Sequence, residues 1–295
     1  MNDPLVYRAP KTTGVIAGRI FIYALLILMV FYFLLPFIVM VLTSLKTMED
    51  IRTGNLISWP REFTLDAWKT AWGSACIAVE CNGIKVYFWN SVKIVVPAVA
   101  ISTLIGAANG YVFSKWKFWG SEVLFSFLLL GCFIPFQAIL LPMAQTLGKL
   151  GLSQSLAGLI LVHIIYGLAF TTLFFRNYYV TIPDELVKAA RIDGAGFFRI
   201  FWKILLPISA PIFVVSIIWQ TTQIWNDFLF GVVFSAGGNQ PITVALNNLV
   251  NTSTGIKEYN VDMAAAIIAA IPTLLVYIIA GKYFMRGLTA GSVKG

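Results

Sequence analysis

The chain has little charge for its size. Only 12% of its 295 residues are Asp, Glu, Lys or Arg, whereas 59% are hydrophobic and the mean hydropathy is +0.83. A soluble globular protein carries about twice this share of charged residues, so the composition favours a membrane protein. The net charge of +8 does not call for a nucleic-acid partner, because cytoplasmic loops of membrane proteins are rich in Lys and Arg.

The sequence also lacks the groups that carry most enzyme chemistry. Its one histidine, His163, lies in an apolar run without an acidic residue, and we expect it to be packed and bonded to a carbonyl group. No GxxxxGK[ST] phosphate-binding loop occurs, which excludes ATP hydrolysis through such a loop in this chain. We therefore expect a non-catalytic chain with no metal and no cofactor of its own.

Cysteine is scarce, with three residues in the chain. Cys132 lies in an apolar run and is expected to be a buried thiol. Cys76 and Cys81 lie in a longer polar segment, residues 46–88. They form a disulfide if this segment faces an oxidising compartment, and two free thiols are the alternative.

Long apolar runs are the dominant feature. A helix needs about 20 apolar residues to cross the hydrocarbon core of a bilayer, and such runs must be helical because unpaired backbone groups are costly in lipid. They are apolar throughout, whereas barrel strands alternate. We predict an all-α membrane protein with six transmembrane helices, in which prolines cause local kinks. The runs cover residues 20–42, 89–113, 123–141, 155–175, 208–230 and 263–284.

The distribution of Lys and Arg predicts the orientation. With the N-terminus inside, the two short outer loops hold only Lys149 and Lys257, so both termini are expected in the cytoplasm. The first apolar run is too long for a cleavable signal and is expected to remain as a span. The predicted organisation is a cytoplasmic segment, a six-helix domain with a long outer segment and a cytoplasmic loop, and a cytoplasmic tail. The cytoplasmic segment covers residues 1–19, the six-helix domain 20–284 and the tail 285–295. Within the domain, the long outer segment covers residues 46–88 and the cytoplasmic loop 176–207.

Several polar and aromatic residues fall within or beside the apolar runs. Amides bond sugar hydroxyls and aromatic rings stack on sugars, so these residues are candidates for a transport pathway; packing between helices is the alternative. A carboxylate at membrane depth is costly, which makes Asp227 a functional candidate, unless it is simply hydrated at the outer boundary. The candidates are Asn90, Gln137, Gln220, Gln223, Trp225, Asn226 and Asp227.

The connection at residues 184–211 has a helical pattern of its own. Asp184 and Glu185 suit the first turn of a helix, and Gly194 and Gly196 are expected to break that helix. A second, amphipathic helix over residues 197–206 would end at Pro207. Such a hairpin either lies on the lipid surface or inserts into a cytoplasmic partner.

The run KAARIDGAGFFRIFWKILLP resembles the EAA loop of inner-membrane permeases of binding-protein-dependent ABC importers. FTLDAW at residues 63–68, WND at 225–227 and YFMRGLTAGSVKG at 283–295 resemble the carbohydrate-uptake branch, that of the maltose-type permeases of family 1. Lys188 replaces the Glu of the EAA triplet, and Glu185 lies nearby, so a salt bridge from that position is not expected. The matching residues are Ala189, Ala190, Asp193, Gly194, Ala195, Ile204, Leu206 and Pro207.

The resemblance implies a type I ABC importer permease fold in a bacterial inner membrane. The implied partners are a second permease, two ABC ATPases that bind ATP and Mg themselves, a periplasmic or surface solute-binding protein, and a sugar such as glucose or mannose. Ala190→Glu is expected to obstruct docking to the ATPase. The alternative is a stand-alone ion-coupled secondary transporter, which would need an internal repeat and ion-coupling residues. The implied coupling residues are Glu185, Lys188, Ala189, Ala190, Asp193, Gly194, Ala195 and Pro207.

Overall fold

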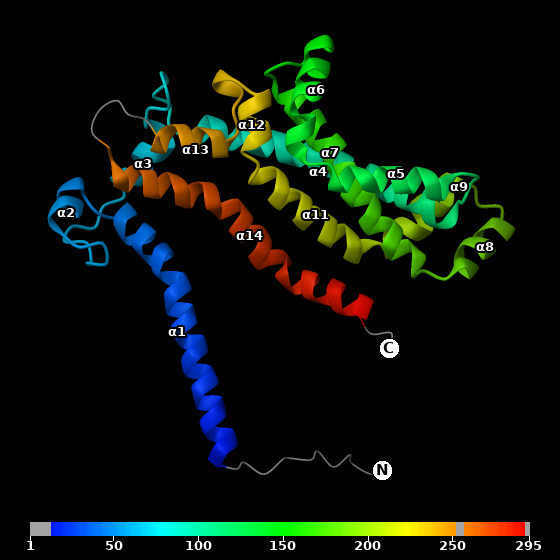
Figure 1. Ribbon diagram of the computed structural model, residues 1–295, viewed down its shortest axis with the longest axis horizontal. Coiled ribbons are helices and arrows are strands. Elements are labelled where there is room, and N and C mark those ends of the chain that lie inside the picture. The colour runs from blue at the N-terminus through cyan, green and yellow to red at the C-terminus, as the bar shows by residue number, and fades with distance from the viewer. Residues whose placement is uncertain (1–12, 252–256, 293–295) are drawn as a thin grey trace. The chain divides into compact units, whose positions relative to one another are not determined.

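The computed structural model describes residues 13–251 and 257–292, with side chains for 14–251 and 257–281. The described part is helical and contains no strand, only one isolated bridge. It divides into two compact units. The first unit contains the residues up to 68 together with 258–264, and the second contains residues 69–257 together with those from 265 onward. The helices (Figure 1) are α1 Thr13–Ser44, α2 Met48–Thr53, α3 Asp66–Gly73, α4 Lys85–Lys115, α5 Ser121–Phe133, α6 Phe136–Lys149, α7 Leu156–Val180, α8 Asp184–Ile192, α9 Phe197–Ile200, the π-helix η1 Phe201–Leu205, α10 Leu206–Ile208, α11 Ala210–Trp225, α12 Leu229–Phe234, the 3-10 helix η2 Gly237–Asn239, α13 Ile242–Val250 and α14 Tyr259–Ser292.

The first unit consists of α1, the polar segment after it and the first residues of α14. Side chains of α1 are exposed along almost its whole length, as expected of a helix that faces lipid. The polar segment folds around the buried Lys46, whose Nζ donates to the Asn55 carbonyl at 3.0 Å and to Ser58 Oγ at 3.0 Å. The FTLDAW motif packs within this unit, since Trp68 Nε1 donates to Ser44 Oγ at 3.3 Å.

The second unit is built on α4 and α7, which run side by side (Figure 1). Small residues allow this close approach. A Cβ added at Gly106 would lie 2.3 Å from Thr171 Oγ1, and one added at Gly110 would lie 2.6 Å from Phe175 Cβ. These glycines form a GxxxG pattern in the sequence, which is a signal for close helix packing in membranes.

Four helices among the described residues are long and apolar enough to cross a membrane without a break, and six spans result only if two bent pairs are counted. The predicted run 123–141 is not a single helix with a local kink: α5 and α6 meet at 103°. Pro135 removes a backbone donor, and the residue before it, Ile134, is extended at φ −66° and ψ 122°. The expectation that Pro135 causes only a local kink is wrong, because the two helices are separated by a break.

The boundaries of the other spans also differ from the prediction. Helices α9, η1 and α10 meet α11 at 78°, and α11 ends at Trp225 rather than at residue 230. Helix α1 begins before residue 20, within the predicted cytoplasmic segment 1–19. Residues 1–12 of that segment, the side chains of the motif at 283–295 and the tail at 293–295 lie outside the described part of the chain.

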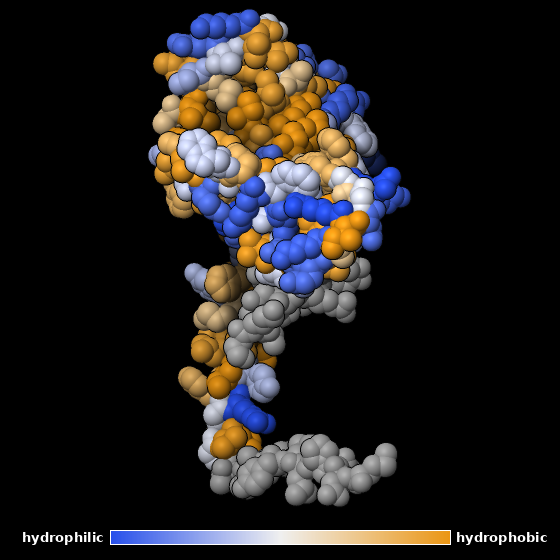
Figure 2. Space-filling view, turned by 90° about the vertical axis from the view of Figure 1, so that its right-hand side faces the viewer, coloured by the Kyte–Doolittle hydropathy of each residue, from blue (hydrophilic) through white to orange (hydrophobic). Residues whose placement is uncertain are grey.

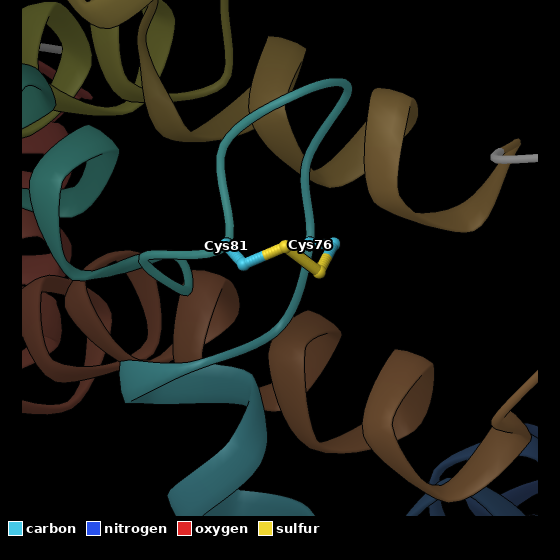
Figure 3. Close-up of a disulfide and its surroundings, with 2 residues drawn as sticks. All are labelled: Cys76 and Cys81. Carbon is cyan, nitrogen blue, oxygen red and sulfur yellow. A yellow bond between two sulfur atoms is a disulfide. The ribbon is translucent and has the colours of Figure 1, made fainter.

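A loop closed by a disulfide precedes α4. The bond joins Cys76 to Cys81 (Figure 3), the alternative that the sequence had left open. Ile77 and Glu80 form the isolated bridge inside this loop, and the side chain of Val79 at its tip is 96% exposed. Cys132 of α5 is a free thiol, as expected, but its exposure is intermediate rather than buried.

Candidate functional site

A cavity of about 450 Å³ lies among α6, α7, α11 and α12 in the second unit. Aromatic rings and a few polar groups form its walls, as is common in sites for small molecules. The α7 wall is one face of that helix, because positions three or four apart lie above one another. The residues of this face are His163, Tyr166, Gly167 and Phe170.

The α11 wall carries amides whose positions depend on α7. Gln220 is 2% exposed, and its Nε2 donates to Ser102 Oγ at 2.8 Å. It passes directly against Gly167, where an added Cβ would lie 2.1 Å from Nε2. The glycine therefore lets the amide reach across from α11 to α4. Gln223, one turn further along α11, is exposed in the cavity.

Asp227 follows the end of α11 and fixes the start of α12. Its carboxylate accepts hydrogen bonds from the backbone N–H groups of Phe230 at 3.2 Å and Gly231 at 3.0 Å. Its Oδ2 lies 3.7 Å from Nε2 of His163, and the side chain is 16% exposed. The structure thus gives this residue a capping role as well as a place on the cavity wall.

The cavity unites some of the predicted pathway residues and excludes others. Gln220, Gln223, Asn226 and Asp227 line it. Asn90 instead bonds the Gly238 and Gln240 carbonyl groups, Trp225 Nε1 donates to the Ala269 carbonyl at 2.9 Å, and Gln137 is exposed on α6 away from the cavity. Asn90 and Trp225 therefore contact neighbouring elements, as in the packing alternative, whereas Gln137 is exposed and does not line this cavity.

The contribution of α7 to the cavity was not predicted from the sequence. His163 has an acidic neighbour after all, because Asp227 of a distant segment lies next to it. Its other neighbour is the ring of Phe230, with ring centroids 5.6 Å apart. The spacing of His163, Tyr166 and Phe170 along one helix face was the available signal.

The second candidate site is the loop between α7 and α11. Val187 and Ala190 of α8 are buried in a core formed with the ends of α4 and α7, and the ring of Tyr111 stacks on Phe197 with centroids 4.7 Å apart. The other face of α8 is open. Ile192 on that face is 87% exposed although it is a large apolar residue.

The ends of α8 are attached to the end of α4. Lys115 Nζ lies 2.6 Å from Asp184 Oδ1, and this hydrogen bond, followed by the Lys115 charge, lowers the pKa of Asp184. At the other end, the guanidinium of Arg191 lies over the ring of Trp116, 4.1 Å from its centroid. Figure 2 faces this end of the second unit and shows hydrophilic side chains gathered beside hydrophobic ones.

Glycine ends α8 as expected. Gly194 has φ +75°, and the N–H of Ala195 donates to the Ala190 carbonyl at 2.8 Å, which closes the last turn. The second helix does not end at Pro207 but continues to Ile208 through the π-helix η1. Since Pro207 has no N–H, the regular α-helical bonding cannot continue unchanged through it.

Two predicted coupling alanines, neighbours on α8, differ in burial. Ala189 is exposed, whereas Ala190 is 8% exposed and packs inside the loop core. The expectation that a glutamate at position 190 would enter a partner's cleft is therefore wrong, because its carboxylate would enter the chain's own core. Glu185, Lys188, Asp193 and Gly194 are exposed, and Ala195 is partly buried.

The family of the chain follows from comparison with known proteins. Residues 98–288 match the family described as "Binding-protein-dependent transport system inner membrane component". The chain belongs to this family. The match confirms the resemblance seen in the sequence and the expectation of a non-catalytic transport component.

Relatives align along almost the whole chain. A "Probable ABC transporter permease protein" of Pyrococcus horikoshii is 39% identical over 278 residues, covering 94% of this chain and 98% of the relative. The xylose/arabinose import permease protein XacI of Haloferax volcanii is 33% identical over 296 residues, covering 92% of each.

The fold is shared with a solved transporter. A chain in the crystal structure of a bacterial ABC transporter involved in the import of the acidic polysaccharide alginate superimposes with a TM-score of 0.82. The two are 20% identical, and the alignment covers 94% of this chain and 99% of the other. This likeness confirms the predicted type I permease fold.

Proposed function

We propose that this chain is the permease subunit of an ATP-driven, binding-protein-dependent sugar importer, and that α8 couples it to an ATPase. The observation that carries the coupling role is the division of α8 into two faces. Val187 and Ala190 fix the helix to the chain's own core, while Ile192 leaves an apolar side chain uncovered next to Ala189. A small residue beside an exposed large one suits insertion into a cleft of another protein.

The proposed partners are those of a binding-protein-dependent importer. Two ATPase subunits would receive the coupling helices and bind ATP and Mg, a second permease would complete the pathway, and a solute-binding protein would deliver the sugar. Support comes from the family description. It also comes from a structure of the alginate transporter in complex with a pentasaccharide-bound periplasmic protein, although that chain is only 16% identical.

The proposed orientation places the loop of α8 and both termini in the cytoplasm of a bacterial cell. The disulfide at Cys76–Cys81 and the α8 contact of Lys115 belong to opposite ends of α4. A helix of 31 residues is about 45 Å long, enough to cross a bilayer. A disulfide is stable outside the cytoplasm, which supports the same orientation as the Lys and Arg distribution.

A neutral or weakly charged sugar suits the cavity in α6, α7, α11 and α12. Its walls offer the rings of Tyr166 and Trp219 and the amides of Gln223 and Asn226, groups that stack on sugar rings and bond hydroxyls. Relatives are named for import of xylose/arabinose, arabinooligosaccharides and alpha-glucosides. A glucose- or mannose-like unit remains our working choice. A stand-alone secondary transporter is not favoured, given the family.

Co-purification tests the coupling role. We would express the tagged chain with its partners and measure the amount of ATPase retained by Ile192→Asp. Burial of an isoleucine side chain stabilises an interface by about 1.5–3 kcal/mol, so the variant should bind ATPase at least about tenfold more weakly. Val79→Asp is the control, because Val79 is also highly exposed, at 96% against 87% for Ile192, and lies in the loop before α4, away from the end that contacts α8. Full retention of ATPase by Ile192→Asp would contradict the proposed contact between α8 and the ATPase.

A further inference from the structure

A second cavity, of about 630 Å³, lies between the end of α4, the turn after it and the inner edge of α8. Its polar walls are unusually basic, with four cationic side chains and one carboxylate. The charged residues are Lys115, Lys117, Lys188, Arg191 and Asp184. Neither the proposed contact of Ile192 with the ATPase nor the proposed binding of sugar explains this surplus of positive charge.

Two of the four cations form the fixed walls. Lys115 pairs with Asp184 at 2.6 Å and also donates to the Ile182 carbonyl. Arg191 lies over the ring of Trp116 and donates to the Lys115 carbonyl at 3.3 Å. These contacts hold α8 against α4 and define the shape of the cavity.

The other two cations are available to a further anion. Lys117 is 67% exposed and only approaches Glu122, with 3.7 Å between Nζ and Oε1. Lys188 is exposed, and among the described residues it has no ion pair. Two ammonium groups at the mouth of a cavity already lined by Lys115 and Arg191 attract a compact oxyanion such as a phosphate group.

The position of the cavity points to the membrane surface. Helix α4 ends at Lys115 and α5 begins at Ser121, so the turn between them joins two apolar segments at one end. Aromatic side chains of this turn are exposed, most of all Trp119 at 99%. Tryptophan at the ends of spans lies at the level of the lipid headgroups, and basic pockets between helices at that level bind anionic headgroups.

We propose that this cavity binds the phosphate group of an anionic phospholipid. Lys117 and Lys188 would contact the phosphate, and Lys115 and Arg191 on the inner walls would add positive charge. Trp119 would lie beside the bound lipid at the level of the headgroups. The proposal depends on the membrane location of the chain and not on the coupling role of α8. Because Lys188 and Arg191 belong to α8, a bound headgroup would touch this helix directly.

Binding of short-chain lipids to the assembled transporter tests the proposal. Dihexanoyl phosphatidylglycerol, dihexanoyl phosphatidylcholine and inorganic phosphate would be titrated separately and scored by native mass spectrometry. Anionic lipid should bind, and the zwitterionic lipid and free phosphate should bind far more weakly. The double variant Lys117→Gln/Lys188→Gln should weaken binding of phosphatidylglycerol about 25-fold, since each basic residue near a membrane surface contributes about a factor of five.

The matched control is Arg199→Gln/Lys203→Gln, which removes two exposed cations from the same loop that do not line the cavity. This control should bind phosphatidylglycerol as the parent does. An equal loss in both double variants would overturn the proposal in favour of general surface charge. Equally tight binding of inorganic phosphate would overturn the lipid assignment in favour of a soluble anion. Absence of binding to the assembled transporter would overturn it in favour of a cavity closed by a partner's acidic side chain.

Discussion

The contact between α4 and α7 makes a quantitative prediction for Gly110→Ala. The added Cβ would lie 2.6 Å from Phe175 Cβ and 2.7 Å from the backbone nitrogen of Arg176. Backbone atoms cannot move aside as a flexible side chain can, so the helices must separate. Overpacking costs about 1–3 kcal/mol, partly offset by about 0.5–1 kcal/mol from replacing glycine with alanine in a helix. The expected net loss in the free energy of unfolding therefore lies between about 0 and about 2.5 kcal/mol, with a central value of about 1 kcal/mol.

Gly131→Ala is the matched control for this substitution. It makes the same chemical change in a neighbouring helix, but its Cβ would lie 3.7 Å from Ala169 Cβ, an ordinary contact. It should therefore leave the stability unchanged or raise it slightly. Both variants would be unfolded in mixed detergent micelles with increasing SDS, followed by circular dichroism. Equal stabilities of Gly110→Ala and Gly131→Ala would refute the close packing of α4 against α7.

Gly167→Ala extends the test to a contact with a side chain. Here the obstructing group is the amide of Gln220, so the cost should include the loss of its hydrogen bond to Ser102, about 1 kcal/mol in a membrane. The double variant Gly167→Ala/Gln220→Ala removes the obstruction. It should recover part of the loss relative to the sum of the single variants, and strict additivity would contradict the proposed contact.

Three further predictions concern polar contacts. Asp227→Ala should lower the free energy of unfolding by about 1–3 kcal/mol, because two N–H groups of α12 lose their acceptor. Asp227→Asn should lower it by less. Equal unfolding curves of Asp227→Ala and the parent in SDS would contradict the capping role. Non-reducing peptide mapping should recover Cys76 and Cys81 in one linked peptide, and alkylation of both thiols without reductant would exclude the disulfide. The lowered pKa of Asp184 means that its bond to Lys115 stabilises the protein above the ordinary pKa of 3.8 and is lost as the pH falls through the lowered value. The difference in melting temperature between the parent and Asp184→Asn should therefore be constant from about pH 5 to 8 and vanish in strong acid. A difference that changed within the neutral range would contradict the lowered pKa of Asp184.

The sequence predicted α8 well because its signals are local. Acidic residues at its start and a glycine after its end are sufficient to place its boundaries to within a residue or so. The same local pattern does not say which face turns inward. That depends on Tyr111 and Phe201, which come from other segments and bury Ala190 rather than Ala189.

The cavity was only partly predictable for the same reason. Gln220, Gln223 and Asp227 could be chosen because polar residues are rare in apolar runs. Their arrangement depends on where α11 ends and on the packing of α7, which bring His163 to Asp227. Pro135 shows a different limit: a proline in an apolar run permits both a kink and a break, and the sequence alone did not distinguish them.

The central claim is that this chain moves sugar only when an ATPase drives it. The direct measurement is uptake of radiolabelled sugar into proteoliposomes that contain the tagged chain, with the sugar chosen by screening the associated solute-binding protein. We predict uptake that requires ATP, the ATPase, the second permease and the binding protein together. Uptake by the chain alone, without ATP, would contradict the account and identify a secondary carrier.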